Sequence, residues 1–134
     1  MTRKRMMGLV AAILIGGGVA TAVAGMKISP YLVTTGSYYA FGSMADARAS
    51  APTDPEYIGC TVAGGPYGTS ASCYALDSNN VYKMCSMPSG AAPTMLPAIE
   101  SIGSQSYIYF SFDTSGNCTT VEAINTSYVS PMVP

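Results

Sequence analysis

Four cysteines, Cys60, Cys73, Cys85 and Cys118, are the residues whose type and spacing most directly suggest chemistry. A zinc site needs closely spaced pairs such as C-x-x-C, or histidine ligands. Here the cysteines are separated by 13, 12 and 33 positions, and the chain contains no histidine. In an exported chain, an even number of cysteines with this spacing predicts two disulfides and no metal site.

Other catalytic arrangements lack an essential part. A serine or cysteine nucleophile normally needs a neighbouring base, and a Ser-Lys pair would have to use Lys83 or Lys27 without a surrounding motif. A pair of carboxylates, as in glycosidases, would draw on Asp77, Asp113, Glu100 and Glu122. Asp77 and Asp113 each open a predicted hairpin loop, where aspartate caps the turn. We therefore expect a protein that is not an enzyme and that uses no cofactor.

Tyrosine is the residue type that points most clearly toward binding, with ten tyrosines and no tryptophan in the chain. Tyr107 and Tyr109 alternate with apolar residues in a predicted strand, so they project from the face opposite the core. Exposed aromatic rings on a sheet can bind bases, sugars or proteins. Arg48 is a further candidate for anchoring a ligand, although a salt bridge with a nearby acidic residue is its simpler role.

The N-terminus, residues 1–24, has the order of residues typical of a secretory signal peptide. A basic triplet at 3–5 is followed by an apolar run, three glycines and an A-x-A cleavage site at 22–24. Because the apolar run is about as long as a membrane span, the alternative is an uncleaved anchor. The expected location is therefore secreted or periplasmic, with membrane contact only if the leader stays attached.

Removal of the leader would make the chain acidic. Three basic residues would remain against seven acidic ones, a net charge of −4. Nucleic acid is therefore not an expected partner, because a basic phosphate-binding surface is absent. The expected partner is an extracellular protein or a cell-surface component.

Three regions are expected along the chain: the signal peptide at 1–24, an N-terminal segment at 25–56, and a disulfide-bonded β-rich domain at 57–134. The N-terminal segment has one candidate strand around Tyr38–Phe41 and then a loop from Ala49. In the β-rich domain the strands are expected at 57–62, 71–76, 81–87, 106–113 and 117–125, with a short helix after Thr94 as its N-cap. This β-β-β-α-β-β order suits a mainly β (α+β) fold, either a small antiparallel sheet or an OB-like barrel.

The first hairpin suggests a disulfide pairing. A three-residue loop at 78–80 places Cys73 opposite Cys85, and cross-strand neighbours lie within reach of a disulfide. Cys73–Cys85 and Cys60–Cys118 are therefore favoured among the three pairings that four cysteines allow. The other side of this hairpin is expected to be its packed face, with Tyr74, Leu76, Tyr82 and Met84.

The second hairpin turns through a loop at 114–116, with Gly116 in the left-handed conformation. This register predicts a core face with Ile108, Phe110, Phe112, Cys118 and Ile124. The opposite face would hold Tyr107, Tyr109, Thr119 and Val121. Glu122 would then share the core face, which counts against a perfectly regular ladder.

Several short motifs occur along the chain from residue 41 onward: FGSMADAR at 41–48, YIGC at 57–60, SCYA at 72–75, MC at 84–85, SYIYF at 106–110 and GNC at 116–118. Together these motifs resemble those of a group of small secreted bacterial proteins without an assigned activity. The resemblance implies export and a shared fold, and it identifies no catalytic residue.

The sequence thus favours a secreted, non-enzymatic module that binds an extracellular protein or surface. A secreted inhibitor of an extracellular hydrolase is the second hypothesis, with the loop from Gly64 to Ser70 as the inhibitory element. An enzyme that uses carboxylates without histidine is the third hypothesis, and a signal-anchored envelope protein is a further alternative.

Overall fold

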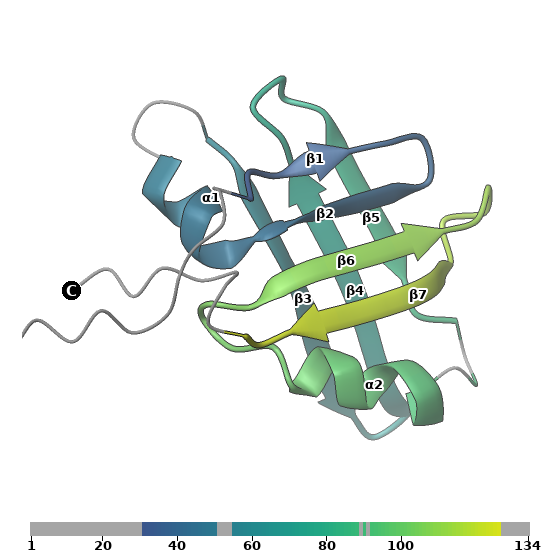
Figure 1. Cartoon of the computed structure of the whole chain (residues 1–134). Helices are drawn as coiled ribbons and strands as arrows, with labels where there is room; N and C mark the ends of the chain where they lie inside the picture. The colour runs from purple at the N-terminus through teal and green to yellow at the C-terminus, as the bar shows by residue number, and fades with distance from the viewer. Residues whose placement is uncertain (1–30, 51–54, 89, 91, 127–134) are drawn as a thin grey trace, which may run out of the picture.

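Two antiparallel β-sheets lie face to face, and the strands of one sheet run across those of the other (Figure 1). The structure is a computed structural model that describes residues 31–50, 55–88, 90 and 92–126. The predicted signal peptide at 1–24 lies outside the described residues. The predicted mainly β, antiparallel fold is confirmed. The described strands form two sheets that do not close into a barrel, so the alternative of an OB-like barrel is wrong.

Nine elements follow one another along the described chain. They are β1 (Thr34–Thr35), β2 (Tyr39–Ser43), α1 (Met44–Ser50), β3 (Tyr57–Gly65), β4 (Gly68–Leu76), β5 (Tyr82–Ser86), α2 (Ala92–Glu100), β6 (Tyr107–Phe112) and β7 (Cys118–Ile124). The four-stranded sheet has the order β1-β2-β6-β7 and the three-stranded sheet the order β3-β4-β5. From Tyr57 onward the predicted order of elements is confirmed.

Consecutive hairpins build the three-stranded sheet. The predicted loop at 78–80 is confirmed: Asn80 has a φ of 60°, the left-handed conformation that asparagine tolerates. The Asp77 N–H closes this loop by donating to the Val81 carbonyl at 3.3 Å. The β3–β4 hairpin is longer than predicted, because β3 runs on past Val62 to Gly65.

The predicted N-terminal strand is confirmed as β2, which lies between β1 and β6 in the four-stranded sheet. Helix α1, which was not predicted, begins directly after β2. The Asp46 N–H donates to the buried Ser43 hydroxyl at 3.3 Å, so Ser43 is the N-cap. The Asp46 carboxylate accepts the Tyr31 N–H at 2.9 Å and ties the helix to the chain before β1.

A β-bulge interrupts the β6–β7 ladder. Asp113 and Asn117 face each other as predicted, but Phe112 pairs with Cys118 while Ser111 pairs with Thr120. The extra residue reverses the faces of β7 beyond this point. The prediction that Val121 points away from the core is therefore wrong.

After the bulge, Val121 lies opposite Phe110 and is buried, at 8% exposure. Glu122 lies opposite Tyr109 and is exposed. The predicted core position of Ile124 is also wrong, because Ile124 pairs with the outward-facing Tyr107.

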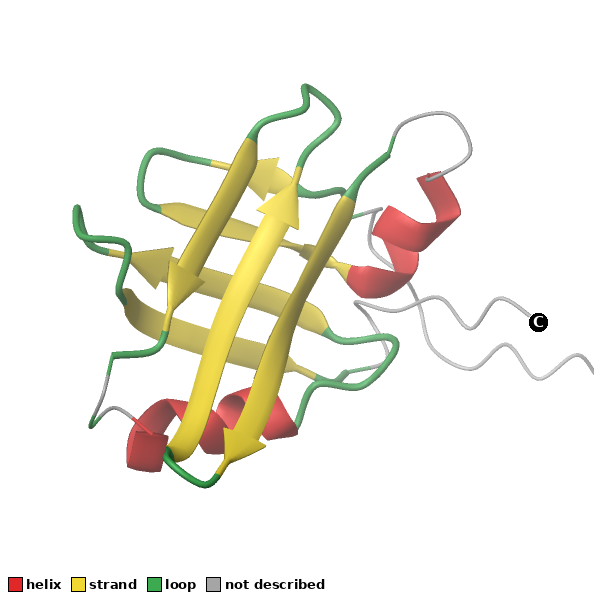
Figure 2. Ribbon diagram, turned by 180° about the vertical axis from the view of Figure 1, so that it is seen from behind, coloured by secondary structure: helices red, strands yellow, loops and turns green. Residues whose placement is uncertain are grey.

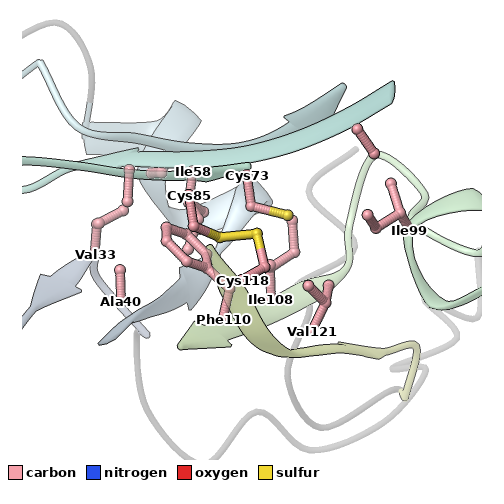
Figure 3. Packing of buried hydrophobic residues seen from close by; sticks show 13 residues of the cluster. Val33, Ala40, Ile58, Cys73, Cys85, Ile99, Ile108, Phe110, Cys118 and Val121 are labelled. Carbon is pink, nitrogen blue, oxygen red and sulfur yellow. A yellow bond between two sulfur atoms is a disulfide. The ribbon is translucent and has the colours of Figure 1, made fainter. Parts of the chain in front are cut away.

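The core lies between the two sheets, as Figure 3 shows. Its largest fully buried apolar side chains are Phe110 and Ile108, both from β6. Ile99 reaches the core from α2, which lies beside β7 across one end of the two sheets (Figure 1). Helix α2 begins at Ala92, so the predicted N-cap Thr94 lies inside the helix.

The predicted disulfide pairing is wrong. Cys60 bonds to Cys73 within the three-stranded sheet, and Cys85 bonds to Cys118 across the core between the two sheets. The predicted register itself is confirmed, because Cys73 lies opposite Cys85. Cys73 also lies opposite Cys60, however, so three cysteines form one row across the sheet. Cys85 faces β7, which brings Cys118 within reach of it.

Candidate functional site

The outer face of the four-stranded sheet carries a cluster of aromatic side chains. β2 and β6 are hydrogen-bonded neighbours, with Phe41 opposite Tyr109 and Tyr39 opposite Ser111. Successive residues of a strand point to opposite faces, so Ile108 and Phe110 are buried while Tyr107 and Tyr109 lie on the outer face, where both are half-buried. The sequence-predicted site residues Tyr107 and Tyr109 are therefore brought together on the outer face.

The rings of this cluster form a continuous series of contacts. The ring centroids of Tyr39 lie 6.1 Å from Phe41 and 6.4 Å from Tyr109, with interplanar angles of 6° and 18°. Phe41 lies 6.1 Å from Tyr107, and the Tyr107 ring meets Tyr31 edge-on at 5.4 Å. We call these five residues the aromatic face. Mutual contact holds the rings in place before any ligand arrives.

The polar groups around the aromatic face are hydroxyls and one carboxylate. The Ser111 and Thr119 hydroxyls lie 2.8 Å apart, and the exposed Glu122 lies opposite Tyr109. Burial, together with the neighbouring Tyr31, Glu122 and Tyr109, raises the pKa of Tyr107. Its hydroxyl is a donor at neutral pH, as an ordinary tyrosine hydroxyl is. None of the four strands contains Lys or Arg. The face therefore favours uncharged or cationic ligands over phosphates.

Arg48, the third predicted site residue, is not part of the aromatic face. It lies on α1, and its guanidinium donates to the Ser104 carbonyl at 2.7 Å. With Glu56, Tyr57 and Ile58 it lines a pocket of about 230 Å³. Its hydrogen bond joins α1 to the loop before β6, which is a structural role.

The three-stranded sheet carries a second exposed face that sequence reasoning assigned wrongly. Its cysteine face is buried against the other sheet, so the predicted packed face points outward. On this outer face Tyr57, Tyr82 and Met84 are 43%, 50% and 48% exposed. The Tyr57 and Tyr74 rings meet edge-on with centroids 6.0 Å apart. This face, which also includes Leu76, is apolar but lies on the surface of the protein and is not packed against another described element.

The end of the β3–β4 hairpin extends beyond the body of the protein. Residues 61–70 are all exposed, and the hairpin tip reaches past α2 in Figure 2. Tyr67, in the turn between the strands, is 103% exposed. The loop predicted from Gly64 to Ser70 is therefore an accessible hairpin tip.

The two hairpin aspartates hold turns in place, as their positions suggest. The Asp77 carboxylate accepts the N–H groups of Asn79 and Val81 at 2.9 and 3.0 Å. Asp113 accepts those of Ser115 and Asn117 at 2.8 and 2.9 Å, and its pKa is lowered chiefly by the hydrogen bonds from Asn117. Within the described ranges, no group of three His, Cys, Asp or Glu side chains could hold a metal ion.

Asp77 also joins the two sheets, because the Thr35 hydroxyl of β1 donates to its carboxylate at 2.6 Å. Burial favours the neutral acid, but the hydrogen bonds from Thr35, Val81 and Asn79, together with the charge of Lys83, outweigh it. The pKa of Asp77 therefore lies below its ordinary value. The resulting stability is complete above pH 5 and is lost as the pH falls through the folded-state pKa.

We expect acid to destabilise the native protein more than the Asp77→Asn variant. At pH 7 the variant should be less stable by about 1–2 kcal/mol, because charge-assisted hydrogen bonds are weakened. Thermal unfolding followed by circular dichroism between pH 7 and pH 2.5 measures both effects. Glu100→Gln, at an exposed position of α2, serves as the control. Parallel acid profiles for the native and Asp77→Asn proteins would contradict this role.

No helix among the described residues is long and apolar enough to cross a membrane. The chain matches no protein family, and neither a curated protein nor a solved structure matches it significantly. The site must therefore be interpreted from its own geometry.

Proposed function

We propose that this protein is an exported, non-enzymatic module that binds a component outside the cell through its aromatic face. The observation that carries the proposal is the continuous series of ring contacts on an outer sheet face. Tyr39 is 40% exposed and the other four rings are half-buried, so the face presents a contiguous aromatic surface of the kind that marks interaction sites. Aromatic rings supply large contact areas at a small cost in side-chain entropy, because they rotate about few bonds.

Export is supported by two independent features. Two disulfides indicate an oxidising environment, extracellular or periplasmic. The order of residues in 1–24 is that of a signal peptide. The resemblance to small secreted bacterial proteins agrees with this location. Cleavage would release the module, whereas an uncleaved leader would tether the same module to the membrane.

The ligand class that we propose is an uncharged, hydroxyl-rich polymer on a cell surface. Flat rings stack on the apolar faces of sugar rings, and the surrounding hydroxyls can exchange hydrogen bonds with sugar hydroxyls. The lack of basic side chains on the four strands disfavours nucleic acids and anionic glycans. A protein surface rich in uncharged side chains is the other partner that this chemistry allows.

A binding screen tests this function. The oxidised protein is incubated with insoluble cellulose and chitin and with envelope extracts, and the bound fraction is measured after sedimentation. We expect retention on at least one of these materials and persistence of binding in 0.5 M salt, because no ion pair is invoked. Absence of binding above background on every material would remove the proposal.

The inhibitor hypothesis is kept as a second candidate because of one observation, the wholly exposed hairpin tip with Tyr67 at its turn. A projecting hairpin whose two strands are joined at the base by the Cys60–Cys73 disulfide can enter the cleft of an extracellular hydrolase at a reduced entropic cost. Assays against a panel of proteases and lysozymes test it. Inhibition that is lost in Tyr67→Ala would support this candidate, and no inhibition of any enzyme would eliminate it.

A further inference from the structure

The outer face of the three-stranded sheet has the composition of a protein–protein interface. Its exposed or half-exposed apolar side chains are Tyr57, Tyr74, Leu76, Tyr82 and Met84. Tyrosine and methionine are enriched at interfaces, whereas charged residues are depleted from interface cores. Lys83 is the only charged residue in the three strands. It alternates with Tyr82 and Met84, so it lies on the other face of the sheet, beside its cross-strand neighbour Ala75. We call this surface the uncharged face.

The distribution of charge identifies a second copy as the partner that fits this face. The described residues carry two basic and six acidic side chains, a net charge of −4, so most approaches between two copies are repulsive. None of the acidic residues lies in the three strands: Glu122 is on the outer face of the opposite sheet, and Glu56 and Asp77, next to the ends of β3 and β4, are buried. The uncharged face lets two acidic copies meet without burying like charges. A basic partner would find no charge complement there.

The edges of the same sheet support this assignment. β3 is an edge strand of nine residues without a charge or a proline, and such edges readily pair with a further strand. Helix α1 packs against the first residues of β3, and beyond them the described part of the chain places no strand on the outer edge of β3. Beyond Cys60 the strand belongs to the exposed hairpin, residues 61–70. This hairpin can lie against a second copy as an arm.

The exposed area sets the strength of such a contact. Tyr57, Tyr82 and Met84 together expose roughly 300 Å² per copy, taking about 200 Å² for each full side chain. A stable interface needs about 800 Å² per partner. The uncharged face alone is therefore too small, and the hairpin arm must contribute the remainder. Because small interfaces are typically those of weak or transient complexes, we expect a dissociation constant on the order of 10 μM.

We propose that two copies of this protein associate through the uncharged face and the hairpin arm to form a symmetric dimer. In a twofold arrangement each patch meets the same patch of its partner. The two sheets form opposite sides of the protein, as Figures 1 and 2 show, so the aromatic faces point away from the dimer contact. If the proposed function is correct, the dimer is bivalent and can cross-link two polymer chains, with a gain in avidity.

Sedimentation of the exported, oxidised protein without any ligand tests the association separately from the binding function. We expect the weight-average mass to rise from monomer toward dimer between 1 and 300 μM. Met84→Glu and Tyr82→Glu should each weaken association at least tenfold, because a twofold contact places the two new charges close together. Thr34→Glu, an exposed position on β1 in the other sheet, should not change it.

Three outcomes would overturn the dimer: a monomer at all concentrations, a dimer that both glutamate variants leave intact, or equal weakening by Thr34→Glu. Circular dichroism of each variant shows that it is folded. The result for the native protein depends on no variant and decides the question even if a variant fails to fold.

Discussion

Phe110→Ala is expected to destabilise the protein by about 3–5 kcal/mol, because it removes the largest fully buried side chain from the core. Phe110 lies opposite Ala40 on β2 and Val121 on β7, so a cavity at this position touches both neighbouring strands. Tyr109→Ala, one residue earlier and on the outer face, should cost only about 1 kcal/mol. Chemical denaturation of the two variants under oxidising conditions measures the difference.

The adjacent pair is informative because the two residues are aromatic, follow one another in β6 and occupy opposite faces of the sheet. A similar loss of stability in both variants would mean that the aromatic face is itself covered by other parts of the protein. A difference of at least about 2 kcal/mol shows that the core and the outer face are assigned correctly.

Loss of the Cys85–Cys118 disulfide is the second large effect. Replacing both residues by alanine should destabilise the protein by about 3.7 kcal/mol from loop entropy, against about 2.9 kcal/mol for the Cys60–Cys73 pair. The sequence separations that the two bonds close are 33 and 13 residues. Cys85–Cys118 also joins the two sheets, whereas Cys60–Cys73 joins strands that are already hydrogen-bonded neighbours.

Thermal unfolding of the two double variants measures this order. We expect the melting temperature to fall by roughly 15–25 °C without the bond between the sheets and by a smaller amount without the bond within the sheet. Under either other pairing each double variant would break both disulfides, so equal falls in the two proteins would contradict the assigned connectivity. Peptide mapping of the native protein checks the connectivity directly.

Local turn chemistry was predictable from the sequence. Asp77 and Asn80 define one three-residue loop, while Asp113 and Gly116 define the other, and both loops have the expected left-handed residue. These positions depend only on near neighbours, because φ and the aspartate hydrogen bonds are set within a few residues. The Ser43 cap of α1 had a similar local signal, with an acidic residue three positions later.

The faces of the strands were harder to predict. In the β4–β5 hairpin the more apolar side carries Tyr82 and Met84, and hydrophobicity alone placed that side inward. The structure buries the smaller Cys73 and Ala75 instead, because the bond from Cys85 to Cys118 directs the cysteine side toward the other sheet. Alternation specifies two faces, and contacts distant in sequence determine which one is buried.

The disulfide error has the same origin. Cys73 lies on the central strand, with Cys60 and Cys85 opposite it on either side. Register alone therefore allows two pairings, and the choice depends on how the second sheet is placed. For the β6–β7 ladder the sequence did contain a signal: the misplaced Glu122 indicated an irregularity, which the structure shows to be a bulge.

The candidate site was predictable in part. Alternation in β6 placed Tyr107 and Tyr109 on an outer face, and the structure confirms their position. Their neighbours Tyr39 and Phe41 could not be assigned to the same face, because the pairing of β2 with β6 joins segments far apart in the chain.

The most direct test of the account is a comparison of two variants for binding to the material that retains the native protein. Phe41→Ala/Tyr109→Ala removes two rings of the aromatic face, while Tyr82→Ala removes an exposed ring from the opposite sheet. Below 1 μM, where a weak dimer is dissociated, we expect about 30-fold weaker binding for the first variant, or about 2 kcal/mol, and unchanged binding for the second. Equal binding by the native protein and the Phe41→Ala/Tyr109→Ala variant would contradict the account.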